Sequence, residues 1–471
     1  VVFVLPSQRA GVFVKQALKD KMTVGFLPEI INVEQFIEQV SDVKKIDSIQ
    51  LLFHFYTIYK KNEANPDSFD VFSSWAFTVI QDFNEIDQHL VNSKDIFIYL
   101  RDIERLRKWS TQGTFKETEL MKDHFSFMEK MNTYYDAFYK FLIENKIGYQ
   151  GLLYREATKK IDDYIDKNEN KKFFFIGFNA LNKAEEFLFQ KMLSTGNSEI
   201  YWDIDTYFLK NPIHEAGEHI RKNIKEGLVS QSKNKVQKYL STVQKEIEII
   251  AVNNSVTQAK LTGELVANLL KNKPLDTFGK QINHTAILLP DEQMLMPLLY
   301  SLPQNTETNV DELINITMGI SLKETPLFTL IENLFSIQNN ILTIDENQKN
   351  IHYKDISRIL YHPYLQFSQK NNPLLKRIQK ENLVYVPIDK LHADSKNGKL
   401  YQLLFRDWKG NVQNCITYFY DLLAFLSKEL NPETHKLDLQ YLFDFYTLIK
   451  RLEITLKGQK DMSILAFKRF L

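Results

Sequence analysis

The pattern of apolar and polar positions is clearest between Lys171 and Asp205. Phe173–Ile176 is a short apolar run, as expected for a strand that is buried on both faces. Asn182 can cap a helix, and Glu185 three residues later completes the spacing of a capping box. Ser198–Trp202 predicts the next strand. This strand–helix–strand order predicts a βαβ unit, in which ligands bind at the carboxyl ends of the strands.

The N-terminus repeats the strand–turn–helix pattern, because the apolar run Val1–Leu5 precedes a predicted helix. A phosphate-binding loop at this place would have the sequence GxxxxGK[ST], with glycines around the phosphates and a Lys and a Ser/Thr for charge and magnesium. Only Gly11 remains, while Val12 and Phe13 replace the Lys and the Ser/Thr. The degenerate loop consists of Pro6, Ser7, Gln8, Arg9, Ala10 and Gly11. We expect it not to bind ATP productively.

Helical periodicity dominates the two long stretches outside these strands. Asp47–Gly148 carries helical apolar stripes, and Gly148 is a plausible C-cap. A second set of strands is predicted at Ile247–Val252, Ala286–Leu289 and Ile314–Met318, alternating with helices. From Phe328 onward the pattern is helical again.

The predicted fold class is α/β with large helical insertions: two RecA-like parallel-sheet domains, each interrupted by a helical subdomain. The first RecA-like domain comprises residues 1–45 and 169–238, separated by a helical insertion over 46–168. The second begins at 239–330 and is followed by a truncated helical insertion over 331–471.

Composition narrows the class of protein. The 471 residues contain 59 Lys+Arg and 59 Asp+Glu, so the net charge neither indicates nor excludes a nucleic-acid partner. The single cysteine, Cys415, excludes an internal disulfide framework and a metal site built from this chain's thiolates alone. Without a signal peptide or a long apolar run, a cytoplasmic location is expected. The chain begins at Val1 and stops within an apparent helix, so we expect a fragment of a longer protein.

Several segments resemble a known family. The segments are VLPSQRAGVFVK, DFNEID, FIGFNALNKAEE, YWDIDTYF, AILLPDE and INITMGISLKETPL. They resemble the N-terminal half of AddB/RexB-type helicase–nuclease subunits, in the Bacteroidetes-like PD-(D/E)XK nuclease variety, and the domain order is similar to that of superfamily 1 helicases. The resemblance covers most of residues 1–330.

The resemblance implies a role in DNA repair by recombination. Such subunits hold DNA without working ATPase motifs and carry a C-terminal exonuclease domain, while an AddA-like helicase partner drives translocation. Such a nuclease needs an Asp at a strand end and a (D/E)xK sequence on the next strand. The Pro-Asp pairs Pro66–Asp67 and Pro290–Asp291 do not fit this pattern, and we assign both to turns. The resemblance implies a magnesium-dependent nuclease domain beyond Leu471, and we expect no catalytic residue, metal ligand or cofactor in this fragment.

The expected DNA contacts are polar and basic residues at predicted strand ends, which would bind phosphates. They are Gln8, Arg9, Asn179, Asn182, Thr257, Gln258, Lys260, Thr317 and Lys323. Two alternatives stay open. One is an ATPase with an atypical phosphate loop, which would hold magnesium with Asp203 and Asp205, near Glu185–Glu186. The other is a structural scaffold that binds a translocase partner without direct DNA contact.

Overall fold

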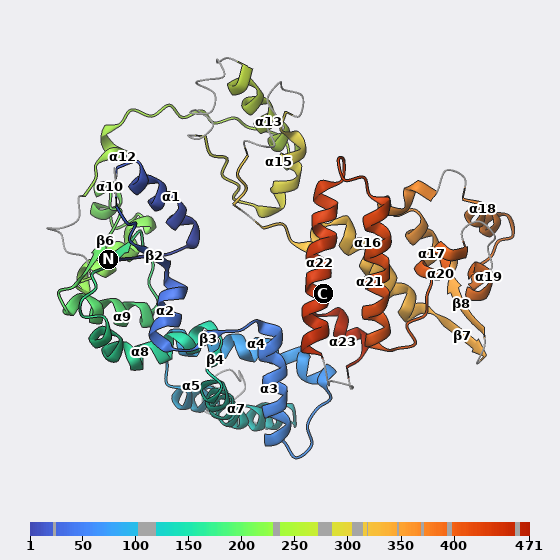
Figure 1. Ribbon diagram of the computed structural model, residues 1–471, viewed down its shortest axis with the longest axis horizontal. Helices are drawn as coiled ribbons and strands as arrows, with labels where there is room; N and C mark the ends of the chain where they lie inside the picture. The colour runs from blue at the N-terminus through green and yellow to red at the C-terminus, as the bar shows by residue number, and fades with distance from the viewer. Residues whose placement is uncertain are drawn as a thin grey trace, which may run out of the picture. The chain divides into compact units, whose positions relative to one another are not determined.

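The computed structural model describes residues 1–21, 25–101, 119–228, 236–271, 285–303, 314–317, 319–345, 348–368, 372–392, 398–456 and 462–471. The chain forms two compact units (Figure 1). Unit 1 consists of Val1–Val243, Asn397–Phe425 and Phe443–Leu471. Unit 2 consists of Gln244–Lys396 and Leu426–Leu442.

A four-stranded parallel sheet organises the N-terminal part of unit 1. The strands lie in the order β2-β1-β5-β6. Their bounds are β1 Val2–Leu5, β2 Glu29–Asn32, β5 Phe173–Ile176 and β6 Ser198–Tyr201. Every pairing is parallel. The predicted strands at Val1–Leu5, Phe173–Ile176 and Ser198–Trp202, and the βαβ unit that joins the last two, are therefore confirmed.

One face of this sheet is closed by a layer of helices, α2 Val33–Ser41, α8 Gln150–Lys167 and α9 Lys183–Ser194 (Figure 1). The ring of Phe175 packs against Phe36 and Phe189, with centroid distances of 5.6 and 4.4 Å. Phe174 points to the other face and is only half-buried. The expectation of a strand buried on both faces is thus wrong, because complete cover exists on one face alone.

The opposite face carries α1 Gln8–Lys19. Gly11 is the one fully buried residue of this helix, and a Cβ at that position would lie 3.3 Å from Cγ2 of Ile30. The missing side chain therefore lets α1 approach β2 closely. Val12 and Phe13 on the same helix remain exposed.

The long helical stretch between β2 and β5 is present as predicted. It contains α3 Ser48–Asn62, α4 Phe69–Gln88, α5 Ser93–Arg101 and α7 Glu119–Glu144 around an aromatic core. Phe55, Phe72, Phe83 and Phe138 are fully buried in it. Gly148 is not a C-cap, because α7 ends at Glu144. It belongs instead to β4 Ile147–Gly148, which pairs in parallel with β3 Lys44–Lys45.

The remaining elements of unit 1 are mostly helical. They include α10 Thr206–Lys210, η1 Glu215–Gly217, α11 Glu218–Lys225, α12 Tyr239–Thr242, α20 Gly398–Leu404 and α23 Ile464–Lys468. The helices α21 Val412–Glu429 and α22 Lys436–Thr455 have residues in both units. Within the described ranges, no helix has both the length and the apolar character needed to cross a membrane.

Unit 2 has no parallel sheet in the residues that the structure describes. Its helices are α13 Ser255–Lys271, η2 Glu292–Met294, α15 Leu295–Ser301, η4 Leu322–Glu324, α16 Pro326–Asn340, α17 Tyr353–Leu360, η5 Pro363–Ser368, α18 Pro373–Lys380 and α19 Ile388–His392. An antiparallel sheet, β7-β8-β9, consists of Leu342–Asp345, Gln348–His352 and Tyr385–Pro387. It lies in a region that was expected to be helical.

The strands predicted at Ile247–Val252, Ala286–Leu289 and Ile314–Met318 do not form in the described part of these segments; Met318 lies outside it. Ile249 and Leu288 are 92% and 90% exposed. An apolar run becomes a strand only where a neighbouring strand takes up its backbone hydrogen bonds. The assignment of two RecA-like domains accordingly stays a prediction.

Candidate functional site

The carboxyl edge of the parallel sheet brings together two turns that are far apart in the sequence. Strands β1 and β5 are direct neighbours, and Val4 pairs with Phe175. Pro6–Ser7 follows β1 and Gly177 follows β5, so the two turns meet. A Cβ built on Gly177 would lie 4.0 Å from Cδ of Pro6. Gly177 has a φ of +80°, a left-handed conformation that favours glycine.

The turn after β1 is shorter than the sequence predicted. Ser7 is the N-cap of α1, and its Oγ accepts a hydrogen bond from the Ala10 N–H at 3.2 Å. Gln8 to Gly11 therefore form the first turn of the helix, and the expectation of a six-residue loop is wrong. Only Pro6 and Ser7 remain between strand and helix, which is too few for backbone N–H groups to surround a phosphate.

The turn after β5 is built as predicted. The Oδ1 atom of Asn182 accepts the Glu185 N–H at 2.8 Å, and Oε2 of Glu185 accepts the Asn182 N–H at 3.1 Å. The capping box is thereby confirmed. Oε1 of Glu185 also accepts a hydrogen bond from the Tyr154 hydroxyl, with an O–O distance of 2.8 Å. Burial raises the pKa of the Glu185 carboxyl, although these hydrogen bonds oppose the shift.

A pocket of ≈ 580 Å³ opens beside this capping box. Its walls come from the first turns of α2 and α8, the C-terminal end of α4, β3, and the turn between β5 and α9. The lining residues are Glu34, Lys45, Gln88, His89, Gln150, Tyr154, Ala180, Leu181, Asn182 and Glu185. We call this space the sheet-edge pocket.

Gln150 gives the sheet-edge pocket an uncommitted acceptor. A side-chain hydrogen bond links it to Tyr154, whose pKa is raised by burial and by the neighbouring Glu185 carboxylate. The Oε1 atom of Gln150 is buried and has no hydrogen-bond partner among the described residues. Buried acceptors of this kind are normally satisfied by water or a ligand. The pocket therefore suits a polar ligand that donates a hydrogen bond.

Four of the nine predicted contact residues lie at this edge of the sheet. Asn182 lines the pocket. Gln8 and Arg9 are exposed in the first turn of α1, and Asn179 is exposed in the turn after β5. The backbone carbonyl of Asn179 accepts a hydrogen bond from Nδ2 of Asn223 at 3.0 Å, which holds the second turn in place.

The other five predicted contacts lie in unit 2, and none of them follows a strand. Thr257, Gln258 and Lys260 belong to the first turns of α13. The Thr257 hydroxyl donates to Oδ1 of Asn254 at 3.0 Å, a local capping contact. Thr317 lies in an irregular stretch and Lys323 in η4. Their placement at strand ends is wrong, because the strands predicted before them do not form.

Three of the four carboxylates of the ATPase alternative, those of Asp205, Glu185 and Glu186, make structural contacts. Asp205 caps α10, and its two oxygens accept the N–H groups of Tyr207 and Leu240 at 2.8 and 3.1 Å. Burial alone would raise the pKa of Glu186, but hydrogen bonds and charge from Lys183 and Lys222 hold it below its ordinary value. Asp203 is exposed. Across the described ranges, no three His, Cys, Asp or Glu side chains come together as a metal-binding group.

Sequence reasoning missed the part of the pocket that comes from the helical block. Gln88 and His89 end α4, while Gln150 and Tyr154 begin α8, so both pairs lie at helix termini. No local pattern marks them, since they meet Asn182 only when the sheet and the helices pack together. No family model matches this sequence, and no curated protein matches it.

Proposed function

We propose that this chain is the DNA-binding, ATPase-inactive, helicase-like part of an AddB-type helicase–nuclease subunit that acts in double-strand break repair by recombination. It holds single-stranded or forked DNA, while an AddA-like helicase partner drives translocation. The observation that best supports the proposal is the carboxyl edge of the parallel sheet, where the turns after β1 and β5 meet and only two residues stand in place of a phosphate loop.

The chemistry of this edge suits nucleic acid in two ways. Arg9 is exposed and cationic, and its guanidinium carbon lies 5.9 Å from the centroid of the Phe13 ring. An arginine beside an exposed ring can bind phosphate and stack on a base. The amide groups of Gln150 and Asn182 can hydrogen bond with polar groups of a nucleotide.

The short turn after β1 supports an inactive rather than an active nucleotide site. A phosphoryl-transfer site needs backbone N–H groups around the phosphates, a Lys, and a carboxylate that holds magnesium. Here Ser7 caps the helix directly, and Asp205 and Glu186 are engaged in structural contacts. Nucleotide hydrolysis that disappears on Asp203→Ala would instead favour the ATPase alternative.

The first test is a titration of the chain with labelled single-stranded and forked DNA at two salt concentrations, with ATP and magnesium in a parallel series. We expect the affinity for DNA to fall as the salt concentration rises, because phosphate contacts release counterions. ATP should leave this affinity unchanged. Arg9→Glu should weaken binding and lower the salt slope by about one. Lys19→Glu, on the far end of the same helix, is the matched control. An unchanged dissociation constant for Arg9→Glu would contradict the assigned contact.

The scaffold alternative has one observation in its favour. Val12 and Phe13 on α1 are 65% and 61% exposed, and exposed apolar patches are typical of protein contacts. Absence of DNA binding at low salt, together with loss of partner binding on Phe13→Ser, would favour a scaffold that does not touch DNA.

A further inference from the structure

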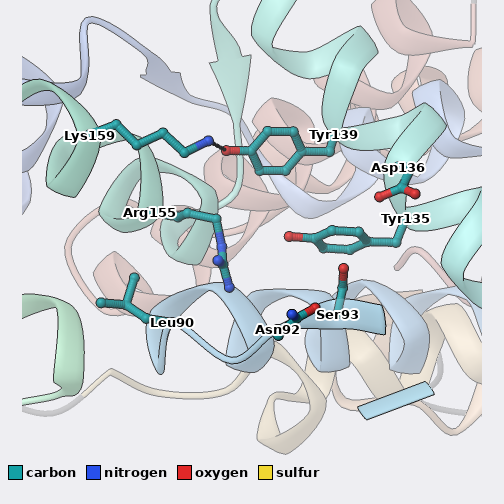
Figure 2. Close-up of a pocket in the computed structure, with 8 residues that line it drawn as sticks. All are labelled: Leu90, Asn92, Ser93, Tyr135, Asp136, Tyr139, Arg155 and Lys159. Atoms are coloured by element: carbon teal, nitrogen blue, oxygen red, sulfur yellow. Dashed lines mark hydrogen bonds between the residues drawn. The ribbon is translucent and has the colours of Figure 1, made fainter. Parts of the chain in front are cut away.

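A second polar pocket, of ≈ 390 Å³, lies within the helical part of unit 1 (Figure 2). Its walls are the turn between α4 and α5, one face of α7 and one face of α8. The lining residues are Leu90, Asn92, Ser93, Tyr135, Asp136, Tyr139, Arg155 and Lys159. None of them lines the sheet-edge pocket. We call this space the helical pocket.

A buried carboxylate holds two of the residues that line the helical pocket, Tyr135 and Arg155. Asp87 is fully buried and accepts hydrogen bonds from the hydroxyls of Tyr135 and Tyr149. It also accepts the Nε–H of Arg155 at 2.5 Å. The Nη2 atom of Arg155 donates to the carbonyl oxygens of Ile86 and Val91 at 2.9 and 2.6 Å. The guanidinium is thus held rigidly before any ligand arrives.

Three of the residues that line this pocket have uncommitted hydrogen-bond donors. Nη1 of Arg155 and the Ser93 hydroxyl have no hydrogen-bond partner in the described part of the chain. Lys159 donates to Oε1 of Glu156 at 2.7 Å and to the Tyr139 hydroxyl at 2.8 Å, which leaves its third proton. Such N–H and O–H donors, two of them on cationic groups, can bind an oxyanion.

The acidic groups nearby limit how much negative charge the pocket can accept. Asp87 and Glu156 are buried, and Tyr135 and Tyr139 donate to them. The Asp136 carboxylate does line the pocket, and its Oδ2 accepts a hydrogen bond from Asn132 at 3.0 Å. In Figure 2 it lies on the opposite side of the pocket from Arg155 and Lys159. A singly charged oxyanion therefore fits better than a doubly charged one.

We propose that the helical pocket binds a phosphoryl oxyanion and prefers the singly charged phosphodiester of a nucleic acid. Arg155 and Lys159 donate to its non-bridging oxygens, and Ser93 donates a third hydrogen bond. The nucleic-acid source rests on the proposed DNA-binding function, whereas the oxyanion site itself does not.

The test measures phosphorus NMR line broadening of dimethyl phosphate and of inorganic phosphate on titration with the chain, beside the DNA titration. Variants are Lys159→Gln and Ser93→Ala, and the control is Lys167→Gln, an exposed lysine at the end of the same helix. Ser93→Ala removes a hydroxyl that no described residue engages, so folding should be retained. Thermal unfolding of each variant verifies this.

The expected result is saturable broadening of dimethyl phosphate that is lost in both variants and kept in the control. DNA affinity should fall roughly tenfold in Lys159→Gln, as expected for loss of a charged hydrogen bond. Absence of saturable broadening with the wild-type chain, or equal broadening in all variants, would overturn the site. Dimethyl phosphate binding with DNA affinity unchanged in Lys159→Gln would overturn the nucleic-acid source alone. Failure of DNA binding with phosphate binding intact would instead overturn the proposed function.

Discussion

The strand Phe173–Ile176 in unit 1 and the segment Ile247–Val252 in unit 2 are both apolar, yet their surroundings differ completely. The first lies between two parallel neighbours, with Phe175 fully buried. The second pairs with no strand in the described part of the chain, and Ile249 is 92% exposed. The difference shows that apolar composition sets the tendency to form a strand, while hydrogen-bonding neighbours decide whether it forms.

The largest expected effect comes from truncating the paired strand. Phe175→Ala removes a ring that contacts Phe36 and Phe189, so it should destabilise unit 1 by about 3–5 kcal/mol. Ile249→Ala, at the exposed position, should change stability by no more than about 0.5 kcal/mol. Urea unfolding and amide hydrogen exchange measure both. If Ile249→Ala lowered the free energy of unfolding as much as Phe175→Ala does, the second segment would have to be packed in a sheet.

A smaller effect is expected where backbones cross closely in unit 1. A Cβ on Gly151 would lie 2.1 Å from the carbonyl oxygen of Asn84, so α8 meets α4 at this glycine. Gly151→Ala should destabilise the chain by about 3 kcal/mol, because the two helices must separate. Gly319→Ala is the control in unit 2, where nothing lies within 4 Å. Urea unfolding compares the two; equal stability of both variants would contradict the close crossing.

The third expected effect is a difference between the two units in how their stability depends on pH. His362 in unit 2 is buried, and burial lowers its pKa below 6.5, although its hydrogen bond to the Pro326 carbonyl opposes this. The unfolded chain then binds the proton more tightly, so stability falls as the pH drops below 6.5. At pH 5 the loss is at most about 2 kcal/mol, a limit set by the distance from the ordinary pKa.

The contribution of Glu185 in unit 1 to stability changes with pH in the opposite direction. Its pKa is raised, so its contribution to stability is complete below the ordinary value of 4.5 and is lost as the pH rises through the folded pKa. Acidification from pH 7 to 5 should therefore weaken unit 2 through His362 without a loss at Glu185. Hydrogen exchange of each unit at the two pH values, with His362→Gln as the comparison, measures this. Equal pH sensitivity of wild type and His362→Gln would refute the assignment.

The two polar pockets differ in how far the sequence indicated them. Asn182 of the sheet-edge pocket follows from strand and capping patterns, since both depend on residues within a few positions of one another. No such pattern indicated the helical pocket. Arg155 and Lys159 lie one turn apart on α8, as Tyr135 and Tyr139 do on α7. Each of these pairs is also typical of an ordinary helix surface, so neither pair alone predicts a binding site.

Local sequence patterns were enough to predict strands β1, β5 and β6 of the parallel sheet and the capping box of Asn182. They also show Val12 and Phe13 where a phosphate loop would have a Lys and a Ser/Thr. The folded chain was needed to show that Gly148 joins a strand and that Ile247–Val252 pairs with no strand in the described residues. Tertiary structure also assembled both pockets. Capping and periodicity are set by nearby residues, whereas strand pairing, burial and pocket walls need partners that only the folded chain supplies.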